Sequence, residues 1–152
     1  MIRVQEEPFD AGAELQALKA GNHAIGATCA FVGTVRDLSG GSDVEAMTLE
    51  HYPGMTEKAL AEIEARARDR WPLEATLIVH RYGRMEPGED IVLVVACSAH
   101  RQAAFDAAAF LMDWLKTKAP FWKLEEGSEG GSWVDARESD DIAAARWSEN
   151  SS

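Results

Sequence analysis

Apolar positions along the chain recur with two periods, and these periods predict its strands and helices. Strands are predicted where apolar residues alternate with polar ones or form short continuous runs. These segments are residues 4–9, 24–36, 44–51, 75–82, 91–99, 121–125 and 132–136. The first is short and is expected at the edge of a sheet. Apolar residues spaced three and four apart predict helices between the strands.

A polar residue that can act as a cap precedes each helical segment. The predicted caps and last residues are Asp10 and Ala20, Thr56 and Arg70, Ser98 and the residue before Pro120, and Asp140 and Trp147. The predicted buried faces are Leu60, Ile63, Ala67 and Trp71 in the second helix and Ala104, Phe105, Ala108, Leu111, Met112 and Leu115 in the third.

The order of these elements is strand, helix, two strands, helix, two strands, helix and two strands, with a short helix at the end. Strands joined by short turns pair antiparallel, so this order predicts an α+β fold rather than a doubly wound parallel sheet. Residues 44–51 are expected to pair with 24–36. The glycine- and serine-rich segment 38–43 is a predicted loop, and no function is assigned to it.

Nothing in the chain is typical of a linker between domains, so a single domain is expected over residues 1–147, with a disordered tail at 148–152. No apolar stretch is long enough to span a bilayer, and the N-terminus has no apolar signal core. The expected location is therefore cytoplasmic, without a membrane partner.

The net charge of −11 argues against nucleic-acid binding, which requires a basic surface. A basic cluster within such an acidic chain therefore indicates a local anion site. Cys29 and Cys97 both lie inside apolar runs and are expected to be buried, reduced thiols. No cluster of histidine and cysteine has the spacing of zinc ligands, so no metal site is expected.

Two segments combine basic residues with a helix end. Ser98-Ala99-His100-Arg101 leads from a strand into a helix, where free backbone N–H groups, with a histidine and an arginine beside them, suit a phosphate. At the other end of that helix, Lys116 and Lys118 precede the break at Pro120 and Lys123 follows it. Phe121 and Trp122 beside them can exclude water, and a lysine shielded from water can act as a nucleophile or base.

Each of these features also has a simpler explanation. Arg101 is a solvated arginine at a helix start, the lysines complement the dipole at a helix end, and Met112 belongs to the core. Arg36, at the end of a predicted strand, is an exposed side chain paired with Asp37. Paired catalytic carboxylates, a Gly-x-Ser-x-Gly turn and a Walker loop are all absent from the sequence.

Five blocks in order resemble the large subunit of molybdopterin synthase, the MoaE family, over nearly the whole chain. They are Phe31-x-Gly33-x-Val35-Arg36, Leu49-Glu50-His51-Tyr52-Pro53-Gly54-Met55, Ser98-Ala99-His100-Arg101, Leu115-Lys116-x-x-Ala119-Pro120-Phe121-Trp122-Lys123 and Trp133-Val134-x-Ala136-Arg137. Each block alone is a weak signal, whereas five blocks in this order and spacing are specific.

The resemblance implies an α/β hammerhead fold with a mainly antiparallel sheet and a small additional β subdomain. It also implies a homodimer of large subunits, with a ubiquitin-like small subunit docked on each to give a heterotetramer. The small subunit carries a C-terminal thiocarboxylate. Two sulfur transfers from it convert cyclic pyranopterin monophosphate to molybdopterin, without a further cofactor.

The resemblance also implies the roles of individual residues. Lys116 and Lys123 are the implied catalytic lysines, with Lys116 nearer the thiocarboxylate. The implied substrate-binding residues, in addition to these lysines, are Thr34, Val35, Arg36, His100, Arg101, Leu124 and Glu125. Phe31 and Met112 form the implied apolar wall, and Arg137 is implied to reach the site of the neighbouring subunit.

Two alternatives remain open at this point. A non-catalytic dimeric module that binds a phosphorylated ligand or a ubiquitin-like tail would retain Arg36 and Arg101 but would not require both Lys116 and Lys123. A cyclic-phosphate hydrolase ranks last, because the sequence supplies neither its metal site nor its pair of general bases.

Overall fold

A computed structural model describes residues 1–36, 46–127, 130–134 and 147 of the chain, with the backbone alone described at 122–127 and 130–134. The elements in chain order are β1 (Ile2–Gln5), α1 (Ala11–Lys19), β2 (Ala27–Thr34), β3 (Ala46–His51), α2 (Met55–Arg70), β4 (Leu73–Arg81), β5 (Gly83–Met85), β6 (Asp90–Ser98), α3 (Arg101–Lys118), β7 (Phe121–Gly127) and β8 (Gly130–Val134). The predicted α+β class is confirmed. The predicted loop at 38–43, the helix capped by Asp140 and the tail at 148–152 lie outside the described residues.

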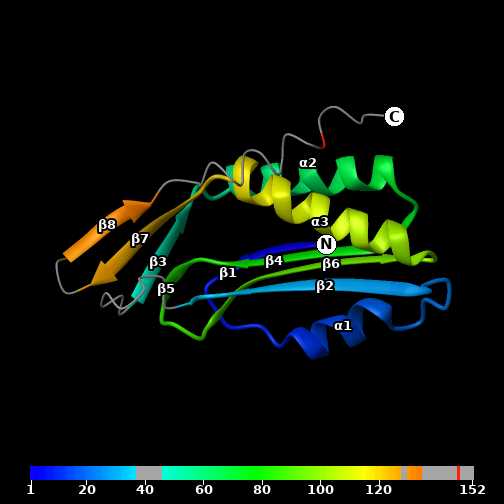
Figure 1. The fold of residues 1–152 in the computed structure, drawn as a ribbon, viewed down its shortest axis with the longest axis horizontal. Coiled ribbons are helices and arrows are strands. Elements are labelled where there is room, and N and C mark those ends of the chain that lie inside the picture. Colours follow the sequence, from blue (N-terminus) through cyan, green and yellow to red (C-terminus); the bar gives the residue numbers. More distant parts are fainter. Residues whose placement is uncertain (37–45, 128–129, 135–146, 148–152) are drawn as a thin grey trace.

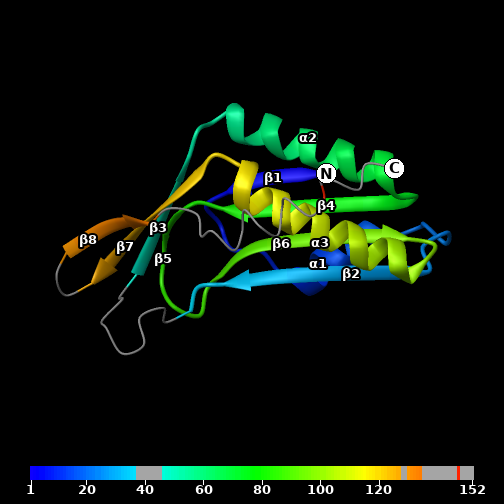
Figure 2. The same ribbon diagram turned by 45° about the horizontal axis from the view of Figure 1, so that its top comes forward.

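Two four-stranded sheets form the framework, in the orders β1-β4-β6-β2 and β5-β3-β7-β8. The first sheet is mixed, because β1 pairs parallel to β4 while β4–β6 and β6–β2 are antiparallel. All pairs of the second sheet are antiparallel. Helices α2 and α3 cover one face of the first sheet and α1 the other, and the second sheet lies beyond one end (Figures 1 and 2).

The expected pairing of β3 with β2 is wrong. Strand β3 lies in the second sheet between β5 and β7. The three-residue strand β5, which the sequence did not predict, is too short to show a period. It begins at Gly83, whose positive φ of 92° permits a bend that leads the chain from the first sheet into the second.

The central strands have side chains buried on both faces, which explains their nearly continuous apolar sequence. One face of β4 and β6 presents Ile78, Val92 and Val94 to α2 and α3. The other presents residues such as Leu77, Val79 and Leu93, against which half-buried residues of α1 pack. Successive side chains of a strand point to opposite faces, so the two cores alternate along each strand.

The start of α1 is as predicted, since the Asp10 carboxylate accepts a hydrogen bond from the Ala13 N–H at 3.1 Å. The other two predicted caps that can be compared are wrong. Thr56 is buried within α2 and donates its hydroxyl to the Tyr52 carbonyl, while Gly54 is the N-cap. Ser98 ends β6 and donates to the Pro72 carbonyl, which leaves His100 as the N-cap of α3.

The buried stripe of α3 differs from the prediction at one aromatic residue. Phe105 is 59% exposed, whereas Phe110 is buried at 2%. Phe110 lies on the flank of α3 that packs toward α2, where its ring contacts Trp71 and Trp147. Periodicity alone did not distinguish these flanks, because the position of α2 beside α3 is a tertiary feature.

Both cysteines occupy apolar surroundings, as expected. Cys97 is fully buried and Cys29 half-buried, and neither forms a disulfide. Burial raises the pKa of the Cys29 thiol, so its reactive thiolate form is disfavoured.

Candidate active site

The end of β2 is held in place by the turn that precedes β6. The Thr34 hydroxyl donates to the Asp90 carboxylate at 2.8 Å. The N–H of Val35 donates to the Glu89 carbonyl at 2.8 Å, and the Val35 carbonyl accepts from the Gly88 N–H at 2.7 Å. Val35 is buried, while the next residue, Arg36, is exposed. The Arg36 guanidinium therefore extends into solvent directly after Val35, a residue whose N–H and carbonyl are both held by hydrogen bonds.

Glycine is required just before this end of β2. A Cβ atom at Gly33 would stand 2.6 Å from Val92 Cγ1 and 3.3 Å from the Phe31 ring. The closer neighbour, Val92, cannot move far because it is buried in the central strand β6. The close approach of β2 to β6 explains why glycine occupies this position in the first sequence block.

The second basic residue considered is Lys116. Its place depends on the direction of α3, whose last turn leads toward the second sheet (Figure 1). Lys116 lies in this last turn and is half-buried. It follows Met112 by four residues, which places both on one flank of the helix. Met112 is itself half-buried, so part of its side chain is exposed and can line the wall of a pocket.

Lys123 lies on β7, where its backbone pairs with Leu49 of β3. Leu124 and Glu125 follow on the same strand, opposite Thr48 and Met47. The side chains of these β7 residues are outside the described atoms, and Arg137 lies outside the described residues altogether.

The start of β7 is packed between aromatic side chains. The Phe121 ring stacks on His80 at a centroid distance of 3.8 Å and lies 6.0 Å from the His51 ring. His51 also packs against Tyr82 at 4.5 Å and hydrogen-bonds with the Thr56 hydroxyl. The second sequence block, which sequence alone left as either a strand end or the edge of a site, therefore borders the strand that carries Lys123.

His100 and Arg101, both exposed, lie far from Arg36 in the same chain. Strands β2 and β6 are antiparallel, with Ala27 opposite Ser98 and Thr34 opposite Asp90. Seven residues of strand separate these two ends, a distance of about 23 Å. Arg101 and Lys116, at opposite ends of α3, are also about 23 Å apart. Within a single chain, the predicted site residues therefore lie in two separate groups. His100 and Arg101 are in one, and Arg36 and Lys116 lie at the opposite ends of β2 and α3.

Phe31, the expected pocket wall on β2, is exposed in the single chain. Its side chain is 42% exposed, and β2 is an edge strand of the first sheet. Val32 is also 39% exposed and Phe105, on the adjoining helix α3, 59%. Exposed apolar groups on an edge strand and an adjacent helix are typical of a contact surface.

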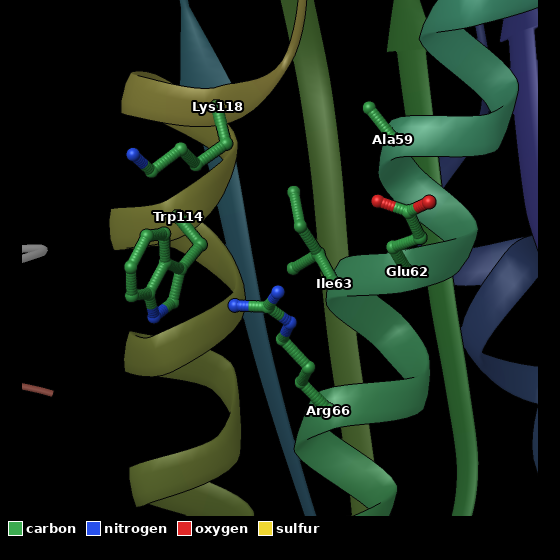
Figure 3. A pocket seen from close by; sticks show the side chains of 6 residues that line it. All are labelled: Ala59, Glu62, Ile63, Arg66, Trp114 and Lys118. Atoms are coloured by element: carbon green, nitrogen blue, oxygen red, sulfur yellow. The ribbon is translucent and has the colours of Figure 1, made fainter. Parts of the chain in front are cut away.

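A separate pocket of about 400 Å³ lies between α2 and α3, lined by Ala59, Glu62, Ile63, Arg66, Trp114 and Lys118 (Figure 3). None of the predicted site residues lines it. Trp114 and Lys118 are four residues apart on α3 and face α2, whereas Lys116 lies on another side of the helix.

Within the described residues, no group of three or more histidine, cysteine, aspartate or glutamate side chains is arranged to hold a metal ion. None of the helices in the described part of the chain combines the length and the apolar character needed to cross a bilayer.

The family model described as MoaE protein matches residues 4–118, which is most of the chain. The chain belongs to the MoaE family. A MoaE-family relative, the molybdopterin synthase catalytic subunit of Pseudomonas aeruginosa, is 61% identical over 148 residues, which cover 97% of this chain and 99% of that protein. The resemblance inferred from the five sequence blocks is confirmed.

Solved structures of the MoaE family share the fold. The molybdopterin biosynthesis MoaE protein from Burkholderia ambifaria superposes with a TM-score of 0.84 at 55% identity, over 97% of each chain. Molybdopterin synthase from Staphylococcus aureus superposes with a TM-score of 0.81 at 31% identity, over 87% of this chain and 95% of that one.

Proposed function

We propose that this chain is the catalytic subunit of a molybdopterin synthase. In this function it converts cyclic pyranopterin monophosphate to molybdopterin with two sulfurs from the thiocarboxylated C-terminus of a small subunit. Relatives that match nearly the whole chain at 61% and 56% identity are named molybdopterin synthase catalytic subunits. The observation that carries the proposal is the position of Arg36. It is exposed, it follows the hydrogen-bonded residue Val35, and it supplies a cation suited to an anionic phosphate ester.

The proposed catalytic groups are Lys116 and Lys123. An ammonium group beside the thiocarboxylate can stabilise negative charge that develops on its carbonyl oxygen, and a neutral amine can attack its carbon. Leu124 and Glu125, which follow Lys123 on β7, are proposed to line the same pocket. Phe31 and Met112 are proposed as apolar wall, and Thr34 and Val35 as the support of Arg36.

The separation of the two basic groups supports a homodimer with sites shared between subunits. Because His100 and Arg101 lie about 23 Å from the Arg36 group in one chain, they cannot bind the same small substrate. We propose that the partner subunit's His100 and the partner subunit's Arg101 complete each site. The exposed apolar residues Phe31, on β2, and Phe105, on the adjoining α3, provide a surface through which the subunits can associate.

A complementation experiment tests this shared site. In a purified heterodimer of one Arg36→Ala subunit and one Arg101→Ala subunit, one site retains both arginines. The heterodimer is therefore expected to show about half the activity of the unmutated dimer. The measurement is molybdopterin formation by differently tagged, co-purified subunits.

The matched control places both substitutions in one subunit and leaves the other unmutated. A shared site predicts that this heterodimer loses activity, because each of its sites lacks one arginine. If instead the control retains half the activity and the first heterodimer has none, both arginines act within one chain.

Several further expectations belong to this proposal. The fold is proposed to be the α/β hammerhead type, with the second sheet as its additional β subdomain, in a single domain over residues 1–147. The partner is a ubiquitin-like small subunit, two copies of which complete a heterotetramer. No cofactor beyond its thiocarboxylate is required, and the proposed location is the cytoplasm.

The decisive experiment combines the purified chain with thiocarboxylated small subunit and cyclic pyranopterin monophosphate. Molybdopterin is expected to form in proportion to the thiocarboxylate added. A matched reaction with the unmodified carboxylate form of the small subunit is expected to give no product. Binding of the small subunit without product in either reaction would favour the non-catalytic binding module.

A further inference from the structure

A buried arginine that the proposed chemistry does not use lies at the end of β4. Arg81 is only 6% exposed, in a protein whose other described arginines lie nearer the surface. Its Nε donates to the Glu6 carbonyl at 2.9 Å, and its Nη1 donates to the Asp90 carbonyl at 3.1 Å. The same Nη1 lies 3.4 Å from the Glu89 carboxylate. One guanidinium therefore joins the end of β1, the turn before β6 and the first residue of β6.

Glu89 connects this guanidinium to β2. Its carboxylate accepts the Glu86 N–H at 2.7 Å, which closes the turn, and its carbonyl accepts the Val35 N–H. The bond from Glu86, together with Arg81, holds the pKa of the Glu89 carboxyl below its usual value, so the carboxylate stays charged. Gly88 of the same turn donates to the Val35 carbonyl. The turn thus forms hydrogen bonds with both the N–H and the carbonyl of Val35, the residue before Arg36.

We propose that Arg81 is a positioning residue for Arg36. It fixes the 86–89 turn, the turn fixes Val35, and Val35 fixes the backbone from which Arg36 reaches the substrate. Arg81 itself is buried and does not touch the substrate. This inference rests on the proposed function only in its last step, the binding of an anionic phosphate by Arg36.

The geometry of the guanidinium explains why arginine suits this position. Its donors point in different fixed directions, so Nε and Nη1 reach carbonyl groups on separate segments at the same time. A lysine retains the positive charge beside Glu89 but offers a single nitrogen on a flexible stem. Arg81→Lys is therefore expected to keep the ion pair and lose part of the bridge between segments.

The first test is hydrogen exchange in the folded protein, which requires no activity. In Arg81→Lys, the amides of Val35 and Gly88 are expected to exchange roughly tenfold faster, while amides of the β4–β6 ladder keep their protection. Glu89→Gln is the second variant, because it loosens the same turn without changing the buried arginine. Arg68→Gln is the matched control, since Arg68 also donates a side-chain hydrogen bond, to Thr76, which lies level with Cys29 in the sheet and so well away from Val35.

The second test links the turn to substrate binding. Arg81→Lys is expected to raise KM for the cyclic phosphate substrate about tenfold and to change kcat less than about twofold. In an Arg36→Gln background the same substitution is expected to change KM less than about twofold, because its effect passes through Arg36. A purely structural role would lower the fraction of active protein and leave KM unchanged.

Three results are distinguishable. Unchanged exchange at Val35 and Gly88 in both variants would overturn the anchoring. Faster exchange with an unchanged KM would overturn the positioning role. If the unmutated chain makes no product, the proposed function fails, and the affinity for inorganic phosphate replaces KM. In that case Arg81→Lys must still weaken phosphate binding, and only when Arg36 is present.

Discussion

Replacement of Lys116 by alanine is expected to lower molybdopterin formation by roughly 10²- to 10⁴-fold, the range for loss of a positioned acid, base or nucleophile. Lys116 is half-buried in the last turn of α3, on the same flank as Met112. Alanine removes the amine and has the highest helix propensity, so the helix itself is expected to persist. The measurement is single-turnover product formation with thiocarboxylated small subunit.

Lys118→Ala is the matched control for this variant. Lys118 occupies the same last turn, so its removal has the same effect on the helix dipole. Its amine lies 5.3 Å from the Trp114 ring, on the side of α3 that faces α2. Turnover is expected to stay within about twofold of the unmutated chain.

Two additional measurements complete the test of Lys116. The circular dichroism spectrum and the binding of the small subunit are expected to be unchanged in Lys116→Ala. Near-normal turnover of this variant would remove Lys116 from the mechanism. Equal losses in both lysine variants would indicate a general charge effect in place of a specific catalytic group.

The largest effect on stability is expected from Phe110→Ala, with a loss of about 3–5 kcal/mol in the free energy of unfolding. The Phe110 ring lies 5.3 Å from Trp71 and 5.7 Å from Trp147, and the Arg70 guanidinium lies 5.3 Å above it. Truncation leaves a cavity among rigid rings, which cannot collapse to fill it. Urea denaturation followed by tryptophan fluorescence measures the change.

Met55→Ala provides the comparison, because it removes a large apolar side chain that is 64% exposed. The expected change is below about 0.5 kcal/mol. If Phe110→Ala lost no more stability than Met55→Ala, the packing of α2 against α3 would not depend on this aromatic cluster. Since subunit association adds to stability, both variants are compared at equal protein concentration.

The elements that sequence predicted well are those whose signal is local. Asp10 provides a side-chain acceptor for the first turn of α1, and the spacing of Leu60, Ile63 and Ala67 defines the buried face of α2. One predicted cap failed because a distant segment competes for its polar group. Ser98 has the chemistry of a cap, but its hydroxyl donates to Pro72, which lies 26 residues earlier in the chain.

For the basic residues of the site, too, some features are local in sequence and others depend on contacts between distant segments. Their identity and order were sufficient to indicate the MoaE family, because the pattern of blocks is linear. Whether Arg36 and Arg101 meet depends on the antiparallel pairing of β2 with β6, and this pairing separates them within one chain. The role of Arg81 was also hidden, since its partners Glu6, Glu89 and Asp90 come together only when β1, β4 and β6 are assembled.

Sequence alone determined the three described helices and most of the described strands of this protein, the α+β class, the family and the set of basic residues suited to an anionic substrate. Each of these follows from periods and motifs within short stretches of chain. The tertiary structure decided which strands are neighbours, which flank of α3 is buried and which basic groups lie together. These features depend on contacts between residues far apart in sequence, for which a local pattern carries no register or direction.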